Sequence, residues 1–158
     1  MKRGLCAIGA LLLALFIAGP AGAQAPVPGT IVVENPWARA TPGAAKISAG
    51  YMTLINKGPL SDRLLGAASP LAEKVQFHKE TEESGVSRMR QVQAVEIQPG
   101  GKVVFKPGEL HMMILGLKRP LREGDSLPLT LQLEKAGNID VSLTVEKVGA
   151  TQPGSRSQ

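Results

Sequence analysis

The chain has 158 residues, with 18 basic and 13 acidic side chains, one cysteine and two histidines. Its positive charge is modest and spread along the sequence, and aromatic residues make up only 3% of the chain. These values argue against nucleic-acid binding, which favours clustered cations and stacking rings.

The first 23 residues have the three parts of a secretory signal peptide. Lys2 and Arg3 supply positive charge, residues 5–18 are apolar, and the small residues 21–23 fit a cleavage site. The apolar stretch is shorter than the roughly 20 residues that a bilayer span needs. We therefore predict cleavage after Ala23, export to the periplasm, and no stable membrane insertion afterwards.

Cleavage would change the inventory of reactive side chains. The mature chain would begin at Gln24 and lose Cys6, so that it could form neither a disulfide nor a thiolate ligand. The loss of two basic residues leaves 16 basic and 13 acidic side chains, a net charge of +3. Both histidines and four methionines would remain.

The mature chain is predicted to hold one domain between two flexible ends. Residues 24–30 are rich in Pro and Gly and are expected to be a flexible lead-in. Residues 150–158 lack apolar periodicity and are expected to be a disordered tail. The segment between them, 31–149, has the length of a single domain.

Short apolar runs typical of β-strands alternate with turn sequences through this domain. The expected strand segments are 30–41, 46–56, 64–78, 86–97, 102–105, 110–117, 127–133 and 138–148. Turns that contain Gly or Pro, such as QPGG and KPGE, separate them. The pattern predicts an all-β, single-domain fold, a cupredoxin-like or immunoglobulin-like β-sandwich. An open barrel is the alternative.

Residues 110–115, LHMMIL, hold one of the two histidines and two of the five methionines. Because successive side chains of a strand point to opposite faces, His111 and Met113 share one face and Met112 points to the other. Methionine commonly fills gaps in protein cores. We expect Met112, like Met52 and Trp37, to be a core residue.

The second histidine and another methionine flank a polar turn. If this segment forms a hairpin that turns about Glu83 and Ser84, His78 and Met89 face each other. Directly opposed side chains have Cβ atoms about 5 Å apart, close enough to share an ion. Two locally formed pairs could then meet across the strands.

The two pairs together offer two imidazoles and two thioethers, from His78, Met89, His111 and Met113. Thioether sulfur selects Cu(I), and imidazole accepts both copper states. Zinc favours thiolate, further imidazole or carboxylate, and calcium favours oxygen. A blue-copper centre needs a cysteine thiolate, and a catalytic motif is missing from the sequence. The pattern therefore indicates a Cu(I) site in a protein that is not an enzyme.

The spacing of these four residues resembles the H-x10-M-x21-H-x-M signature of the PCuAC family of periplasmic copper chaperones. The segments NPWAR, SAGYMTLIN, DRLLGAASP and KPGELHMM also resemble that family's landmarks, so the resemblance extends from about Ile31 to Val148. A random match to a preset spacing is rare, which favours the copper reading over core packing.

The resemblance implies a cupredoxin-like sandwich that holds one Cu(I) per chain near its surface through His78, Met89, His111 and Met113. It also implies that the protein hands copper to the copper A subunit of cytochrome c oxidase, alone or with Sco-type thiol chaperones. A monomer is expected. Some relatives carry a His- or Met-rich C-terminal extension for a second copper, and residues 150–158 contain neither residue type.

Two departures and two alternatives accompany this prediction. Many family members have an aliphatic residue in place of Met112, and Arg88 and Arg90 flank Met89 on the opposite face, which indicates a solvated metal edge. A periplasmic copper storage or resistance protein would use the same four residues. A metal-free immunoglobulin-like module of the cell envelope would leave their spacing as coincidence.

Overall fold

The computed structural model describes residues 30–83 and 85–154. The predicted signal peptide and nearly all of the predicted lead-in lie outside the described residues. The described part of the chain contains ten strands and no helix, so it has no helix that could cross a membrane. The predicted all-β, single-domain sandwich is confirmed.

The ten strands are β1 (Ile31–Arg39), β2 (Ile47–Asn56), β3 (Asp62–Ala68), β4 (Lys74–Glu83), β5 (Val86–Val92), β6 (Val95–Ile97), β7 (Lys102–Phe105), β8 (Leu110–Leu115), β9 (Ser126–Leu133) and β10 (Gly137–Glu146). Two of the eight expected segments each form two strands. The segment 64–78 is interrupted at residues 69–73, where Pro70 lies in a turn and cannot donate a ladder hydrogen bond. The segment 86–97 is interrupted at residues 93–94.

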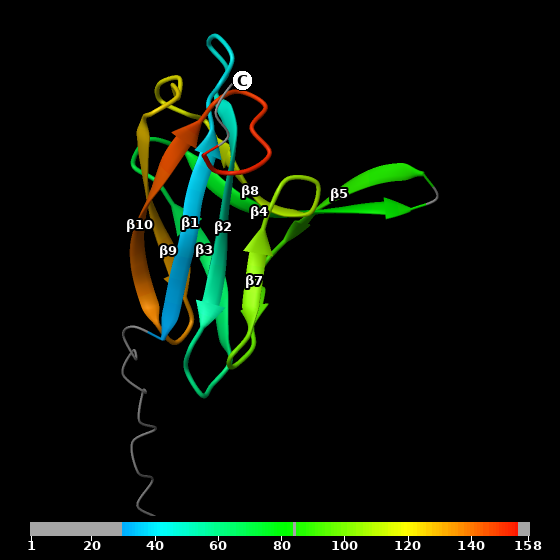
Figure 1. The fold of residues 1–158 in the computed structure, drawn as a ribbon, viewed down its shortest axis with the longest axis vertical. Coiled ribbons are helices and arrows are strands. Elements are labelled where there is room, and N and C mark those ends of the chain that lie inside the picture. Colours follow the sequence, from blue (N-terminus) through cyan, green and yellow to red (C-terminus); the bar gives the residue numbers. More distant parts are fainter. Residues whose placement is uncertain (1–29, 84, 155–158) are drawn as a thin grey trace, which may run out of the picture.

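The strands form one curled sheet in the order β5-β4-β8-β2-β1-β10-β9-β3-β6, with β7 paired to β2. The pairing of β1 with β10 is parallel, and the other pairings are antiparallel. β2 pairs with β8 along its first half and with β7 along its second half. The distal parts of β4 and β5 form a hairpin that projects from the sandwich, hereafter the arm (Figure 1).

The core lies inside the curled sheet and follows a period of two. In β9 the residues Leu127, Leu129, Leu131 and Leu133 are all buried. Met112 and Ile114 of β8 face the same interior. Gly50 makes room for them, because a Cβ atom there would lie 3.1 Å from the Met112 Cε. Met52 and Met112 are buried in this core as predicted, and Trp37 is buried in a separate small cluster with Tyr51 and Ala150.

The segment after β10 packs against the outer face of β1 and β2. Ala150 is buried together with Trp37 and Tyr51, and its carbonyl accepts a 2.8 Å hydrogen bond from the Arg39 Nε. The amide of Gly154 donates to Glu146. The first residues of the segment expected to be a disordered tail thus have defined contacts, because the small apolar side chain of Ala150 fits against the two rings. Residues 155–158 lie outside the described residues.

Candidate metal centre

The two histidines meet across neighbouring strands. β4 and β8 are antiparallel, and their register places His78 directly opposite His111. The ring centroids are 6.1 Å apart. Because directly opposed residues share a face, both imidazoles lie on the outer face of the sheet, away from Met112 and the core.

The hairpin register differs from the predicted one. His78 pairs with Gln91, and Met89 pairs with Glu80, so the predicted direct opposition of His78 and Met89 is wrong. The turn lies between the paired residues Glu83 and Val86 rather than at 83–84. Gly85 has a φ of 76°, which glycine adopts without strain, and this favours the turn position that includes it.

This difference preserves the face of Met89. A one-residue slip would move a side chain to the opposite face, whereas the observed pairing is displaced by two residues. Met89 therefore remains on the face of His78, as a diagonal neighbour. Diagonal neighbours are about 7–8 Å apart, within reach of long side chains.

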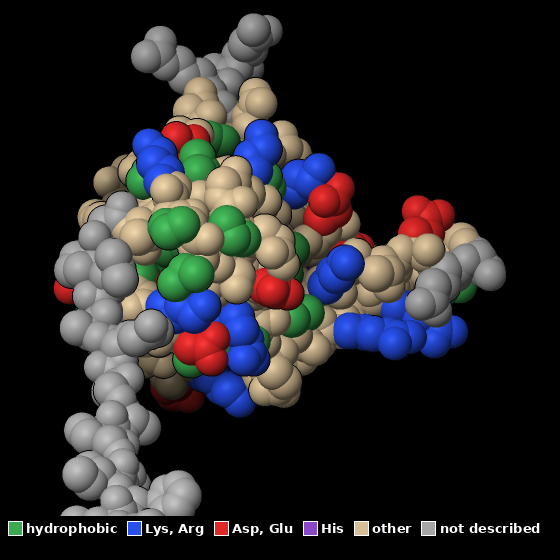
Figure 2. Space-filling model, turned by 90° about the horizontal axis from the view of Figure 1, so that it is seen from below, with side chains coloured by type: hydrophobic (Ala, Val, Ile, Leu, Met, Phe, Trp, Pro, Cys, Tyr) green, Lys and Arg blue, Asp and Glu red, His purple; other side chains and the backbone are tan. Residues whose placement is uncertain are grey.

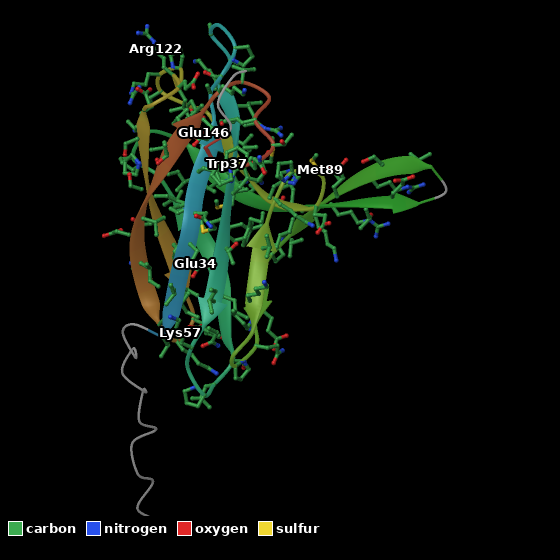
Figure 3. The ribbon with its side chains drawn as sticks, in the orientation of Figure 1. Glu34, Trp37, Lys57, Met89, Arg122 and Glu146 are labelled. Carbon is green, nitrogen blue, oxygen red and sulfur yellow. The ribbon has the colours of Figure 1, made fainter. Side chains whose placement is uncertain are left out.

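The four predicted ligands lie along a diagonal across β8, β4 and β5. Met113 lies one step along β8 from His111 and opposite Gln76, and Met89 lies beyond His78 toward the arm. The imidazoles thus occupy the middle of the diagonal and the thioethers its two ends. Figure 3 shows Met89 at the root of the arm.

The ring of His111 is held by its backbone. Its Nδ1 lies 2.8 Å from the carbonyl oxygen of Glu109. A carbonyl only accepts, so Nδ1 carries the proton and Nε2 keeps its lone pair. Histidine ligands of metals are commonly oriented by such a bond. His111 is 6% exposed, so its orientation is also fixed by packing.

His78 has one nitrogen with a polar contact and one without. Its Nε2 lies 3.3 Å from the Gln76 Oε1, and Gln76 Nε2 donates to Gln91. The Nδ1 atom is buried and has no hydrogen-bond partner. Burial of the ring, with the nearby His111, lowers the pKa of His78 below its ordinary value. The neutral form, which binds metal, is thereby favoured.

The two thioethers differ in accessibility. Met113 is partly buried, whereas Met89 is 54% exposed. Met112, between His111 and Met113, is fully buried in the core. An incoming ligand could therefore reach the metal face from the side of Met89.

The outer face includes neighbours that the sequence pattern did not single out. Glu80 is directly opposite Met89, and Tyr51 lies at the end of the β2–β8 pairing, next in register to His111. Burial raises the pKa of the Tyr51 hydroxyl, Arg39 opposes the rise and Glu80 adds to it. Trp37 stacks on Tyr51 with centroids 4.3 Å apart. No pattern in the sequence marks Glu80 or Tyr51 as part of this face; only the register of the strands places them there.

The donor set fits a soft ion. In residues 30–83 and 85–154, no three His, Cys, Asp or Glu side chains gather as a metal site. A site on His78 and His111 must therefore draw further donors from other residue types, and Met89 and Met113 share their face. Two imidazoles with two thioethers suit Cu(I).

Comparison with solved structures places the fold among PCuAC domains. The PCuAC domain of PmoF2 has a TM-score of 0.68 in its apo form at 28% identity, covering 80% of this chain and 98% of that one. Its copper-bound form has a TM-score of 0.66 at 28% identity, covering 77% and 96%. The solution structure of CuI-DR1885 from Deinococcus radiodurans has a TM-score of 0.58 at 32% identity, covering 80% and 83%.

The sequence comparisons give the family. Residues 31–145 match the family model described as "Putative lipoprotein LpqE-like", and the chain belongs to this family. The relative "Putative lipoprotein Lxx21020" of Leifsonia xyli subsp. xyli is 27% identical over 130 residues, which cover 80% of this chain and 77% of that protein.

Proposed function

We propose that this protein is a periplasmic copper chaperone that holds one Cu(I) through His78, Met89, His111 and Met113. The observation that carries the proposal is the shared outer face of these four side chains, with both imidazoles opposed at its centre. The unpartnered Nδ1 of His78 and the oriented ring of His111 support it. The copper-bound PCuAC domain of PmoF2 and CuI-DR1885, which are both similar to this chain in fold, add further support.

The geometry suits a carrier that works by ligand exchange. Thioether sulfur favours Cu(I), and because these four donors carry no charge, a thiolate of an acceptor can compete with them for the ion. Met89, on the exposed strand β5, is the donor most accessible to a competing ligand. An incoming thiolate or thioether could replace it first, while His111 and Met113 still hold the ion.

The test is an anaerobic Cu(I) titration of the mature chain, residues 24–158, against a chromophoric chelator. We expect a stoichiometry near one, and a weaker affinity in Met89→Ala and in Met113→Ala. The matched control is Met112→Leu, which removes a thioether from the core and should leave copper binding unchanged. Failure of the wild-type chain to compete for Cu(I) would end the copper proposal and favour a metal-free envelope module.

We propose delivery to the copper A centre of cytochrome c oxidase, either directly or through Sco-type thiol chaperones. The Cu(I)-loaded protein would be mixed with the apo copper A domain, and the copper A absorption would be followed after oxidation. Transfer within minutes is expected. Retention of copper beside an intact acceptor would instead favour storage.

A further inference from the structure

The strand β5 is the end strand of the sheet. It pairs with β4 on one side, and within the described part of the chain no other strand pairs with its outer edge. Every residue of Val86–Gln91 is exposed. An edge strand presents a row of backbone N–H and C=O groups that can pair with another chain.

The two faces of the arm differ in chemistry. On the face that continues the outer, metal side, Met89 lies opposite Glu80. On the other face, Arg90 lies opposite Lys79, and Arg88 is the next residue of that face along β5. Figure 2 shows blue side chains gathered along the projecting arm. The same strand thus carries a proposed copper ligand and, on its reverse, two cations at a spacing of two.

These cations disfavour pairing between two copies of β5. An antiparallel self-pairing centred on Met89 would place Arg88 of one copy opposite Arg90 of the other, twice. Like charges directly opposite one another destabilise a sheet. This register is therefore disfavoured for a second copy, whereas a strand with carboxylates at alternate positions would place opposite charges against Arg88 and Arg90.

We propose that β5 is a docking edge that accepts an extended strand of a partner protein, with acidic side chains at alternate positions against Arg88 and Arg90. Backbone pairing would supply affinity, and the alternating charges would select the partner and its register. Its relevance to copper transfer rests on the proposed function. A strand docked on β5 would lie directly beside Met89.

A polypeptide fits this surface better than a membrane does. The three cations of this face, Lys79, Arg88 and Arg90, are few for binding an anionic lipid surface, where each contributes about 1 kcal/mol, and lipids make no use of a β-edge. A hollow of about 450 Å³ also lies at the body end of this face, with an apolar lining that includes Val92 and Val95 and with Lys79, Glu96 and Glu109 at its polar parts. An apolar side chain at the end of a docked strand would have room there.

The experiment uses the ¹⁵N-labelled mature chain without copper, in 150 mM salt. The probe is the peptide acetyl-Thr-Glu-Val-Glu-Val-Glu-Thr-amide, and amide shifts and hydrogen exchange of β5 are followed. We expect slower exchange and shifted amides in β5. A peptide with the same charges but N-methylated on alternate amides, so that it cannot pair, should bind at least tenfold more weakly.

A second comparison tests the role of charge with two variants that have the same change in net charge. Arg88→Glu/Arg90→Glu should bind the acidic peptide at least tenfold more weakly, and should bind the peptide in which Lys replaces Glu. Lys57→Glu/Arg122→Glu, which changes exposed residues away from the arm, should bind like the wild type (Figure 3). Correct folding of both is checked by their amide spectra.

Three results would overturn the proposal. They are equal binding of the N-methylated peptide by the wild type, equal losses in the two variants, and binding of phosphatidylglycerol vesicles without binding of the peptide. Cu(I) titration of Arg88→Glu/Arg90→Glu, whose metal face is unaltered, separates this proposal from the copper site. Retained copper binding with lost peptide binding is expected.

Discussion

Met112 and Met113 are adjacent in sequence and have opposite environments. Met112 is fully buried among core residues such as Ile114, and Met113 lies on the outer face with His111. Truncation of Met112 should therefore affect stability, whereas truncation of Met113 should affect copper binding. Met112→Ala should lower the free energy of unfolding by about 2–5 kcal/mol, because it leaves a cavity, and should keep the copper stoichiometry.

Met113→Ala is the matched comparison for this residue-scale prediction. It should change the free energy of unfolding little and weaken Cu(I) binding. Urea unfolding of the apo proteins and chelator competition measure the two quantities. Equal losses of stability in the two variants would contradict the assignment of the faces.

The pKa of His78 gives a residue-scale pH dependence. Burial and His111 lower this pKa in the folded protein, so the unfolded chain takes up the proton at higher pH. The contribution of neutral His78 to stability is present above the unfolded pKa of about 6.5 and is lost as the pH falls toward the lower folded value. In urea unfolding from pH 8 to 5, the wild type should lose this extra stability relative to His78→Gln. Parallel curves for the two proteins would contradict it.

The arm is the element whose geometry copper should change. Met89 and Met113 lie at the two ends of the diagonal, four residues apart along the strand direction and two strands apart across it, which is about 16 Å in a flat sheet. Both thioethers can reach one ion only if the arm twists or bends over the two imidazoles. We therefore expect Cu(I) to slow the amide hydrogen exchange of Val86–Val92.

Met89→Ala tests this coupling. At a saturating concentration of Cu(I), His78, His111 and Met113 should still hold the ion, but the arm should exchange as fast as in the apo protein. Hydrogen exchange of Leu127–Leu133 in β9 is an internal control, since that strand lies apart from the metal face. Protection of β5 that persists in Met89→Ala would show that Met89 does not close the site.

The sequence predicted the elements and their faces better than their pairings. The alternation in 127–133 correctly places four leucines in the core, and the alternation in 110–115 correctly separates Met112 from His111. These are local properties with a period of two. The register of the arm depends on which residues occupy the turn, and the positive φ of Gly85 decides between two close positions.

The opposition of His78 and His111 could not be read from the sequence. It arises because β8 lies between β4 and β2, a long-range choice that the local pattern does not encode. The sequence also gave no sign that Ala150 packs on Trp37, since one alanine carries no periodic signal. The alternation of side chains along each strand thus agrees with the shared face of the four donors. Their diagonal arrangement follows from the pairing of β4, β5 and β8, which the sequence does not predict.

At the scale of the whole molecule, the last described segment completes the outer face. Truncation after Val148 would remove Ala150 from Trp37 and Tyr51 and would remove the acceptor of the Arg39 Nε. We expect the emission of Trp37, the only tryptophan, to shift to longer wavelength. The free energy of unfolding should fall by about 0.5–3 kcal/mol.

Truncation after Gly154 is the control, because it keeps these contacts and the hydrogen bond from Gly154 to Glu146. Its emission and stability should equal those of the full mature chain. An unshifted emission in the shorter chain would show that the two rings are covered without the C-terminal segment.

The two-sided character of β8 has a consequence for how such a protein can diversify. Because Met112 and Ile114 serve the interior and His111 and Met113 serve the outside, a single codon can exchange a donor without repacking the fold. Replacement of Met113 by histidine or aspartate would move the preference toward harder ions on an unchanged scaffold. Deletion of one residue within the strand would instead send a histidine into the hydrocarbon interior. Point substitutions on the outer face can therefore change the metal ion that is bound and keep the fold, whereas an insertion or deletion in β8 would disrupt the core.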